Sequence, residues 1–160
     1  MERVVILGGG NVGSVASTLD AAERLIAERI GAVVSRSTDY TTEAWGFSSD
    51  SAFTNRAWVV STALEPMEVM DTLLQIESEL GRNRKQEYRS KVLQRQSYAN
   101  RVVDLDILLY GEHLVVTAHL QVPHPMLLER DFALQPMCSA LGITVEQGVE
   151  LVTKIVEDEI

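Results

Sequence analysis

The sequence has few of the features that stabilise secreted or membrane-bound chains. Its 160 residues contain one cysteine, Cys138, so no internal disulfide can form. The apolar spacing around Cys138 favours a buried structural position over a reactive thiol. No apolar run approaches the roughly 20 residues of a membrane span, and the segment 1–8 places an acid, Glu2, where a signal peptide would carry basic charge. We therefore expect a cytoplasmic protein that does not contact a membrane.

Basic residues are also scarce, except in one segment. The chain carries 14 Lys and Arg against 23 Asp and Glu, a formal net charge of −9, which argues against nucleic acid as a partner. Seven of the cations lie between Arg82 and Arg101 beside a single acid, Glu87, whereas the rest of the chain has seven cations and 22 acids. Positive charge concentrated at one place, instead of spread over a face, predicts a small polyanionic ligand.

The hydrophobic pattern, without linkers or repeats, predicts one domain over residues 1–160. A β-branched strand over 3–7 precedes a helix that ends near Ile30. Further strands are expected over 32–40, 53–64 and 102–110, with a hairpin return at 113–117, and further helices over 66–80, 126–141 and 144–156. This order predicts an α+β fold of ferredoxin-like βαββαβ type, an antiparallel sheet with two helices on one face. Segments 41–54 and 82–100 are expected to be long mobile loops, and 142–160 a helical tail.

A glycine-rich turn follows the first strand. Residues 8–13, GGGNVG, fit the G-x-G-x-x-G fingerprint of dinucleotide-binding proteins. The acid that such proteins carry about 20 residues later is missing, and no helix separates the second and third strands. An NAD(P)-binding oxidoreductase and a ferredoxin-like nucleic-acid-binding module remain as alternative functions. Otherwise the glycines form a tight strand-to-helix turn, in which Asn11 ties the loop together or faces a substrate.

Two aspartates on one strand are the most specific chemical feature. Alternation places Asp104 and Asp106 on the same face, about 6 to 7 Å apart, while the residues between and after them point to the other face. Like charges on one face repel each other unless a cation lies between them, and paired carboxylates hold the Mg²⁺ ions of phosphoryl-transfer sites. Arg101, three residues earlier, would lie beside the phosphate oxygens. No G-K-[S/T] sequence is present, so a nucleotide would be held without a Walker loop.

These residues belong to a longer set of motifs that resembles a known family. The motifs are LGGGNVG at 7–13, YTTEAWG at 40–46, FTN at 53–55, IE at 76–77, GRNR at 81–84, RVVDLDILLYG at 101–111, VPHP at 122–125 and RDF at 130–132. Over about residues 4–141 the chain strongly resembles the 6-hydroxymethyl-7,8-dihydropterin pyrophosphokinases of folate biosynthesis. The resemblance implies a ferredoxin-like fold that transfers diphosphate from ATP to the pterin hydroxymethyl oxygen and releases AMP, with two Mg²⁺ ions.

The resemblance also implies roles for individual residues. Asp104 and Asp106 would hold the metal, and Arg82 and Arg101 would act with them in catalysis. ATP, as co-substrate, would contact Glu77, Arg82, Arg84, Tyr98, Arg101, Ile107, His124 and Arg130. The pterin would lie against Thr42, Glu43, Trp45, Phe53, Asn55, Tyr98 and Phe132. The expected partners are these small molecules alone, and the expected state is a monomer, with a homodimer as the alternative.

The chain departs from the usual family pattern in one segment. The family commonly has Trp-Gly-Pro-Arg before the aspartates, where this chain has YANR at 98–101, and the basic segment is longer than usual. Tyr98 would therefore supply the ring that closes the site. Segments 41–54 and 82–100 would close over the substrates and exclude water.

Overall fold

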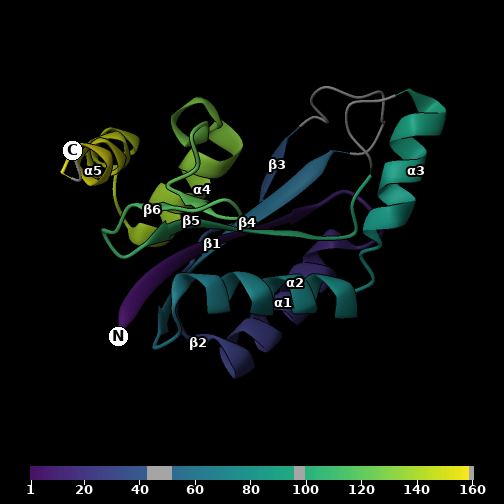
Figure 1. Cartoon of the computed structure of the whole chain (residues 1–160), viewed down its shortest axis with the longest axis horizontal. Helices are drawn as coiled ribbons and strands as arrows, with labels where there is room; N and C mark the ends of the chain where they lie inside the picture. Colours follow the sequence, from purple (N-terminus) through teal and green to yellow (C-terminus); the bar gives the residue numbers. More distant parts are fainter. Residues whose placement is uncertain (43–51, 96–99, 159–160) are drawn as a thin grey trace.

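The computed structural model describes residues 1–42, 52–95 and 100–158 (Figure 1). Its main sheet has the strand order β2–β4–β1–β5, every neighbouring pair is antiparallel, and β3 pairs with β4. These strands are β1 (Glu2–Gly10), β2 (Gly31–Arg36), β3 (Tyr40–Thr42), β4 (Phe53–Thr62) and β5 (Asp104–Tyr110). The order and the directions confirm the ferredoxin-like prediction. An antiparallel sheet also excludes the parallel arrangement that a dinucleotide fingerprint requires.

Two helices cover one face of this sheet, as predicted. Helix α1 (Val15–Arg29) and helix α2 (Pro66–Glu79) lie below the sheet in Figure 1. Their buried stripes, which include Ile26 and Ile76, pack against Ile6 and Trp58 of the sheet. Proline at the first position of α2 fits the helix start, because the missing N–H would have no helical partner there.

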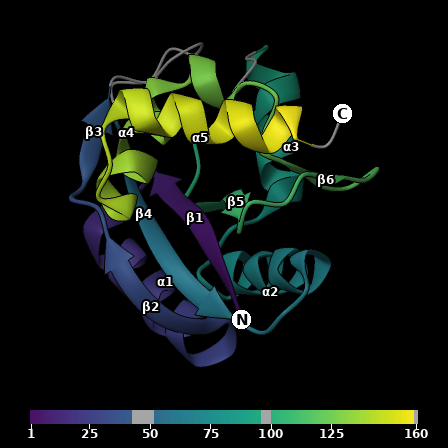
Figure 2. The ribbon, with the colours of Figure 1, turned by 90° about the vertical axis from the view of Figure 1, so that its left-hand side faces the viewer.

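Two further helices cover the opposite face, so the domain has three layers where the sequence indicated two. Helix α4 (Asp131–Leu141) and helix α5 (Val145–Glu157) lie above the sheet in Figures 1 and 2. Alternate residues of β1, such as Val5, pack against α4. Cys138 is buried in this layer, which confirms its structural assignment.

Three predicted elements differ in the structure. The strand expected over 32–40 breaks after β2, because Ser37 turns the chain and exchanges hydrogen bonds with Ala57 through its backbone N–H and its hydroxyl. Residues 113–117 were expected to form a hairpin with the preceding strand, but they do not pair with β5. Instead β6 (Val115–Val116) pairs with β7 (Gln121–Val122). The helix expected over 126–141 is divided, because a 3₁₀ turn (η1, Leu127–Glu129) ends before α4 begins.

The largest difference concerns the basic segment expected to be a loop. Residues Arg84–Gln94 form helix α3, which stands away from the sheet in Figure 1. The side chain of Asn83 caps this helix by accepting a hydrogen bond from the backbone N–H of Gln86. No residue of α3 is buried, so the helix lacks the apolar stripe by which the sequence pattern would reveal it.

None of the helices in the described ranges is long and apolar enough to span a bilayer.

Candidate active site

The glycine turn brings two predicted site residues together. In the sheet register, Gly9 stands opposite Asn55 of β4 on one side and Asp104 of β5 on the other. A Cβ on Gly9 would lie 2.1 Å from the Asn55 Oδ1, and a Cβ on Gly10 would lie 2.5 Å from the carbonyl oxygen of Val102. The glycines therefore permit close approach of neighbouring groups. In this protein, that is the role of the sequence that resembles a dinucleotide-binding fingerprint.

Asn11 ties this turn to the segment that carries Arg101. The Asn11 side-chain oxygen accepts the Arg101 backbone N–H at 2.8 Å, and its amide nitrogen donates to the Asn100 Oδ1 at 2.9 Å. The Asn11 backbone N–H donates to the Arg101 carbonyl oxygen at 2.9 Å. The prediction that Asn11 ties the loop together is confirmed, and the Arg101 backbone is held at both its N–H and its carbonyl.

Strand β5 presents its two aspartates to a cleft, as the alternation predicts. Leu105 and Ile107 are buried on the α2 side, whereas Asp106 is open to the cleft. Asp104 accepts hydrogen bonds from Arg82 Nη1 at 2.9 Å and from Arg101 Nη1 at 3.0 Å. Asp106 makes no hydrogen bond to any residue that the structure describes.

Asp106 lies close to two other acids, and the positive charge around it does not balance all three. Desolvation by the surrounding protein and the negative charges of Asp104 and Glu77 raise the pKa of Asp106 to about 7, and the nearby arginines only partly oppose this. A carboxylate in such surroundings gains most from a cation placed beside it. Perturbed pKa values of this kind in a cleft are typical of functional sites.

A cluster of ion pairs lies directly behind the aspartates. Arg82, with a side chain only 4% exposed, donates to Glu77 and Asp104 through Nη1, and to Glu87 through Nε and Nη2. Glu77 is buried, and it also accepts the Leu105 backbone N–H at 2.7 Å and Nη2 of Arg84 at 2.9 Å. Burial raises the pKa of Glu77, although these donors oppose the rise.

The resemblance suggested that Glu77 lies beside the nucleotide, and that assignment stays a prediction. Glu77 is not among the described residues that line the cleft. Its carboxylate is occupied by protein donors, because α2 ends directly behind β5. Glu77 therefore orients Arg82 and Arg84.

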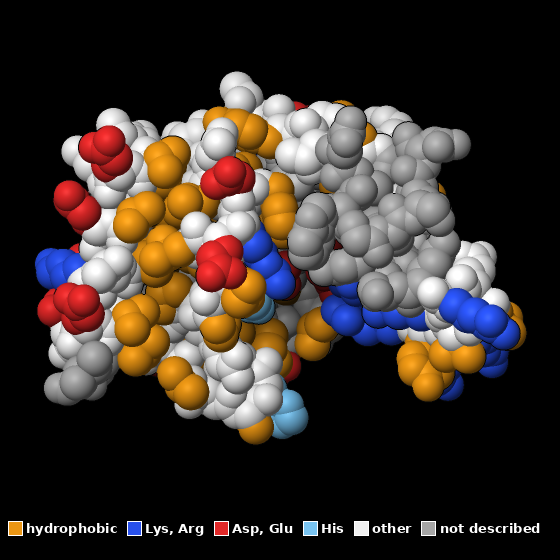
Figure 3. Space-filling view, turned by 90° about the horizontal axis from the view of Figure 1, so that it is seen from above, with side chains coloured by type: hydrophobic (Ala, Val, Ile, Leu, Met, Phe, Trp, Pro, Cys, Tyr) orange, Lys and Arg blue, Asp and Glu red, His pale blue; other side chains and the backbone are white. Residues whose placement is uncertain are grey.

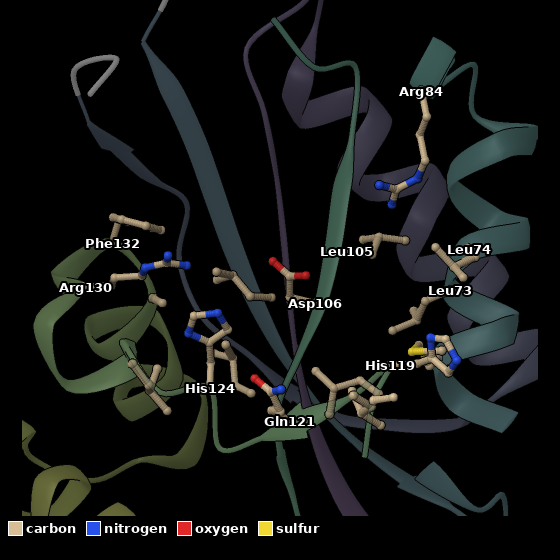
Figure 4. A pocket seen from close by; sticks show the side chains of 18 residues that line it. Leu73, Leu74, Arg84, Leu105, Asp106, His119, Gln121, His124, Arg130 and Phe132 are labelled. Atoms are coloured by element: carbon tan, nitrogen blue, oxygen red, sulfur yellow. The ribbon is translucent and has the colours of Figure 1, made fainter. Parts of the chain in front are cut away.

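The cleft has two parts that meet at Asp106. One part, a cavity of about 400 Å³, is lined by the predicted pterin residues Thr42, Phe53, Asn55 and Phe132, together with Arg82, Arg101 and Asp104. The other part is lined by Leu73, Leu74, Leu105, Ile107, His119 and Gln121. Both parts are lined by Leu7, Arg84, Asp106, His124, Arg130 and Phe132. In Figure 4, His124 and Arg130 approach Asp106 from one side, and the leucines of α2 lie on the other.

The structure thus gathers most of the predicted site residues around one cleft. Glu43, Trp45 and Tyr98 lie outside the described residues. Sequence reasoning missed Leu73, Leu74, His119 and Gln121. The two leucines fit a core stripe, and His119 and Gln121 reach the cleft only because β7 packs beside β5.

His124 has a defined orientation in the cleft. Its Nδ1 accepts the backbone N–H of Met126 at 3.0 Å, which leaves Nε2 as the donor available to a ligand. Burial and the positive charge of Arg130 lower the pKa of His124, so the ring is neutral near pH 7. The Arg130 guanidinium lies 5.9 Å from the centre of the Phe132 ring, a cation–π contact at the rim of the cleft.

Charge is distributed unevenly over the surface. In Figure 3, Lys and Arg side chains gather at the right-hand end, where α3 lies, and Asp and Glu side chains lie at the left-hand end, over α5. Because Arg84 at the start of α3 lines the cleft, the predicted concentration of positive charge adjoins the cleft.

The donor set fits magnesium rather than a metal held by the protein alone. No group of three or more His, Cys, Asp or Glu side chains that could hold a metal occurs within residues 1–42, 52–95 and 100–158. Mg²⁺ is commonly held by one or two carboxylates together with substrate phosphates. Asp104 and Asp106 meet this requirement when a phosphate-bearing substrate lies beside them.

Comparison with known proteins shows the family of this chain. The family model of 7,8-dihydro-6-hydroxymethylpterin-pyrophosphokinase (HPPK) matches residues 5–141. The 2-amino-4-hydroxy-6-hydroxymethyldihydropteridine pyrophosphokinase of Porphyromonas gingivalis is 34% identical over 138 residues, which cover 86% of this chain and 89% of that protein. The protein of the same name from Aquifex aeolicus is 36% identical over 138 residues, covering 86% and 79%.

Solved structures agree at the level of the fold. A crystal structure of HPPK-DHPS in complex with substrates aligns with a TM-score of 0.66 over 98% of this chain and 44% of that chain, at 12% identity. The chain belongs to the HPPK family, and its activity is pyrophosphoryl transfer from ATP to hydroxymethyldihydropterin in folate synthesis.

Proposed function

We propose that the two parts of the cleft bind the two substrates separately, with the phosphoryl transfer at Asp104 and Asp106 between them. The observation that carries this proposal is the position of Asp106. It stands where the two parts meet, its pKa is raised, and it makes no hydrogen bond to a described residue. A phosphate with its counter-ions at this point can contact a ligand in either part.

The part lined by Phe53, Asn55 and Phe132 binds the pterin in this proposal. Aromatic rings provide flat apolar surface for a flat bicyclic ring. Asn55 is buried, and its amide can both donate to and accept from the polar edge of the pterin. Its side-chain oxygen lies over Gly9, so its position depends on the absence of a side chain there.

The part lined by α2, β5 and β7 binds the adenosine of ATP. Leu73, Leu74 and Ile107 supply an apolar surface for the base. His119 and Gln121 supply the polar groups that can read its edge.

The triphosphate then extends along the hydrogen-bond donors of the cleft, three arginines and a neutral histidine. Arg84, Arg101, His124 and Arg130 all line it. The Arg101 Nε is buried and donates no hydrogen bond to a described residue, so it has a donor available for a phosphate oxygen. Asp104 and Asp106 would hold two Mg²⁺ ions, which would supply Lewis-acid stabilisation of the phosphate charge.

The protein contributes position and electrostatics to the reaction. The pterin hydroxymethyl oxygen forms a bond to the β-phosphorus of ATP as the bond from that phosphorus to the AMP oxygen breaks, and the hydroxyl proton is released to water. Arg101 and His124 stabilise negative charge as it moves onto AMP. The Asn11 contacts that fix the Arg101 backbone reduce the reorganisation needed during this step.

Other expectations stay predictions. They are a single domain over 1–160, a monomeric state, a cytoplasmic location and the closing of segments 41–54 and 82–100 over the substrates.

Gly9→Ala tests the division of the cleft. A methyl group on Gly9 would meet the Asn55 Oδ1 at 2.1 Å and displace the pterin-binding amide. We expect the KM for the pterin to rise about tenfold while the KM for ATP changes less than about threefold, with AMP release as the assay. Gly13→Ala is the matched control, because its Cβ meets nothing within 4 Å and only its positive φ of 68° is disfavoured. Equal changes in both KM values for Gly9→Ala would contradict the proposed division.

A further inference from the structure

The hydrogen-bonding capacity of Arg82 is almost fully used inside the protein. An arginine side chain has five N–H groups. In Arg82, Nη1 donates to Glu77 and to Asp104, both at 2.9 Å. Nε and Nη2 donate to the two carboxylate oxygens of Glu87, at 3.0 and 3.1 Å. The edge formed by Nε and Nη2 is therefore taken by a carboxylate, and this is the edge that would grip a phosphate in a bidentate way.

The three acidic partners of Arg82 differ in how easily they can leave. Glu77 is buried and also holds the Leu105 N–H, and Asp104 belongs to the central sheet. Glu87 lies on α3, no residue of which is buried. No residue of α3 belongs to the hydrophobic core, so moving Glu87, whose side chain is 12% exposed, leaves that core intact, whereas moving either other acid disturbs β5.

We propose that Glu87 is an internal competitor of the ATP triphosphate: it occupies the bidentate edge of Arg82, and a phosphate group of ATP binds there by displacing it. Carboxylate and phosphate present similar pairs of oxygens to a guanidinium, so one can replace the other without moving Arg82. The inference rests on the proposed path of the triphosphate along the arginines of the cleft. It adds that Glu87 sets the affinity for ATP.

Displacement of Glu87 also affects Arg101. The Glu87 Oε1 lies 3.9 Å from the Arg101 Nε, too far for a hydrogen bond but close enough for charge attraction. When Glu87 leaves, both arginines lose a competing negative charge. The cost of breaking the Arg82–Glu87 pair is then subtracted from the binding free energy of ATP.

Equilibrium binding of a non-cleavable ATP analogue tests the competition. We would titrate the full chain with α,β-methylene-ATP in the presence of Mg²⁺ by isothermal titration calorimetry. Glu87→Gln keeps the shape of the side chain and removes its charge, so we expect the Kd to fall about tenfold. Glu79→Gln is the matched control: it removes one acid that pairs with Arg29 at the surface, away from the cleft, and the Kd should stay within about twofold.

A second variant separates the contact with Arg82 from the net charge. Glu87→Asp keeps the charge but is one methylene too short to hold both Nε and Nη2, so we expect the Kd to fall about threefold. An unchanged Kd in Glu87→Asp, or a weaker affinity in Glu87→Gln, would overturn the competition. If the folded wild-type protein binds no analogue, the proposed ATP site itself is wrong, which is a different result from binding that Glu87 does not influence.

Discussion

Two buried arginines in this domain are built alike and stand in contrasting surroundings. The side chain of Arg56 is 9% exposed and that of Arg82 is 4% exposed. Arg56 holds Asp39 through Nε and Nη2, at 2.6 and 3.0 Å, and Asp20 through Nη1 at 2.7 Å. Arg82 likewise holds one carboxylate with its Nε–Nη2 edge and two others with Nη1. Burial and ion pairing alone therefore do not distinguish a structural arginine from a functional one.

The acids around the two arginines show the difference. The hydrogen bond from Arg56 and its charge lower the pKa of Asp20, so positive charge is sufficient there. Beside the Arg82 cluster, the pKa of Asp106 is raised to about 7, chiefly by desolvation and then by Asp104 and Glu77. Of the two arginine clusters, the one beside the cleft is short of positive charge, and the metal ions bound to a triphosphate would supply it there. In the proposed function, Asp106, whose charge is not balanced, marks the site, and the balanced ion pairs of Arg56 support the fold.

Among the tests of this comparison, Asp106→Asn has the largest expected effect, which is on kcat. The amide cannot supply the negative charge that holds Mg²⁺, so kcat should fall about 1000-fold. AMP release measures the loss. The fold should persist, because Asp106 makes no hydrogen bond to the described chain, and circular dichroism would verify this. Full activity in Asp106→Asn would show that the unbalanced acid does not mark the site.

Arg56→Met should lower the stability of the fold and leave kcat nearly unchanged, the reverse of Asp106→Asn. The change leaves Asp39 and Asp20 without their donor, but both acids can reach solvent, so we expect the free energy of unfolding to fall by about 2 kcal/mol. Urea unfolding measures this, and kcat should stay within about threefold. A large loss of kcat at full stability would place Arg56 in the active site and end the contrast with Arg82.

The pH dependence of stability gives a third test of the comparison. Unfolding returns the pKa of Asp106 from about 7 to its ordinary value of 3.8. Between these values the folded state retains a proton that the unfolded state has lost, so stability falls as pH rises from about 4 to about 7. Urea unfolding without Mg²⁺ should show this decline in the wild type and a smaller one in Asp106→Asn. The same slope in both proteins would mean that Asp106 is not crowded by its neighbours.

Local patterns predicted part of the site well. The two-residue period of a strand was sufficient to place Asp104 and Asp106 on one face, because side-chain direction in a strand depends only on position. The apolar period of a helix did not reveal α3, because this helix has no apolar stripe and is stabilised by its cap and its helix-forming residues. The family motifs identified Glu77, but its burial behind Arg82 depends on how α2 ends against β5, which no local pattern shows.

The sequence by itself determined the fold class, the activity and the carboxylate pair, because strand periodicity and the motif set are properties of the chain alone. Only the tertiary structure decided which charges are balanced. Asp20 and Asp106 are the same residue type, and their pKa values shift in opposite directions because burial and neighbouring charges come from segments far apart in the chain. The same holds for Glu87, which meets Arg82 only because α3 places it beside β5 and the end of α2.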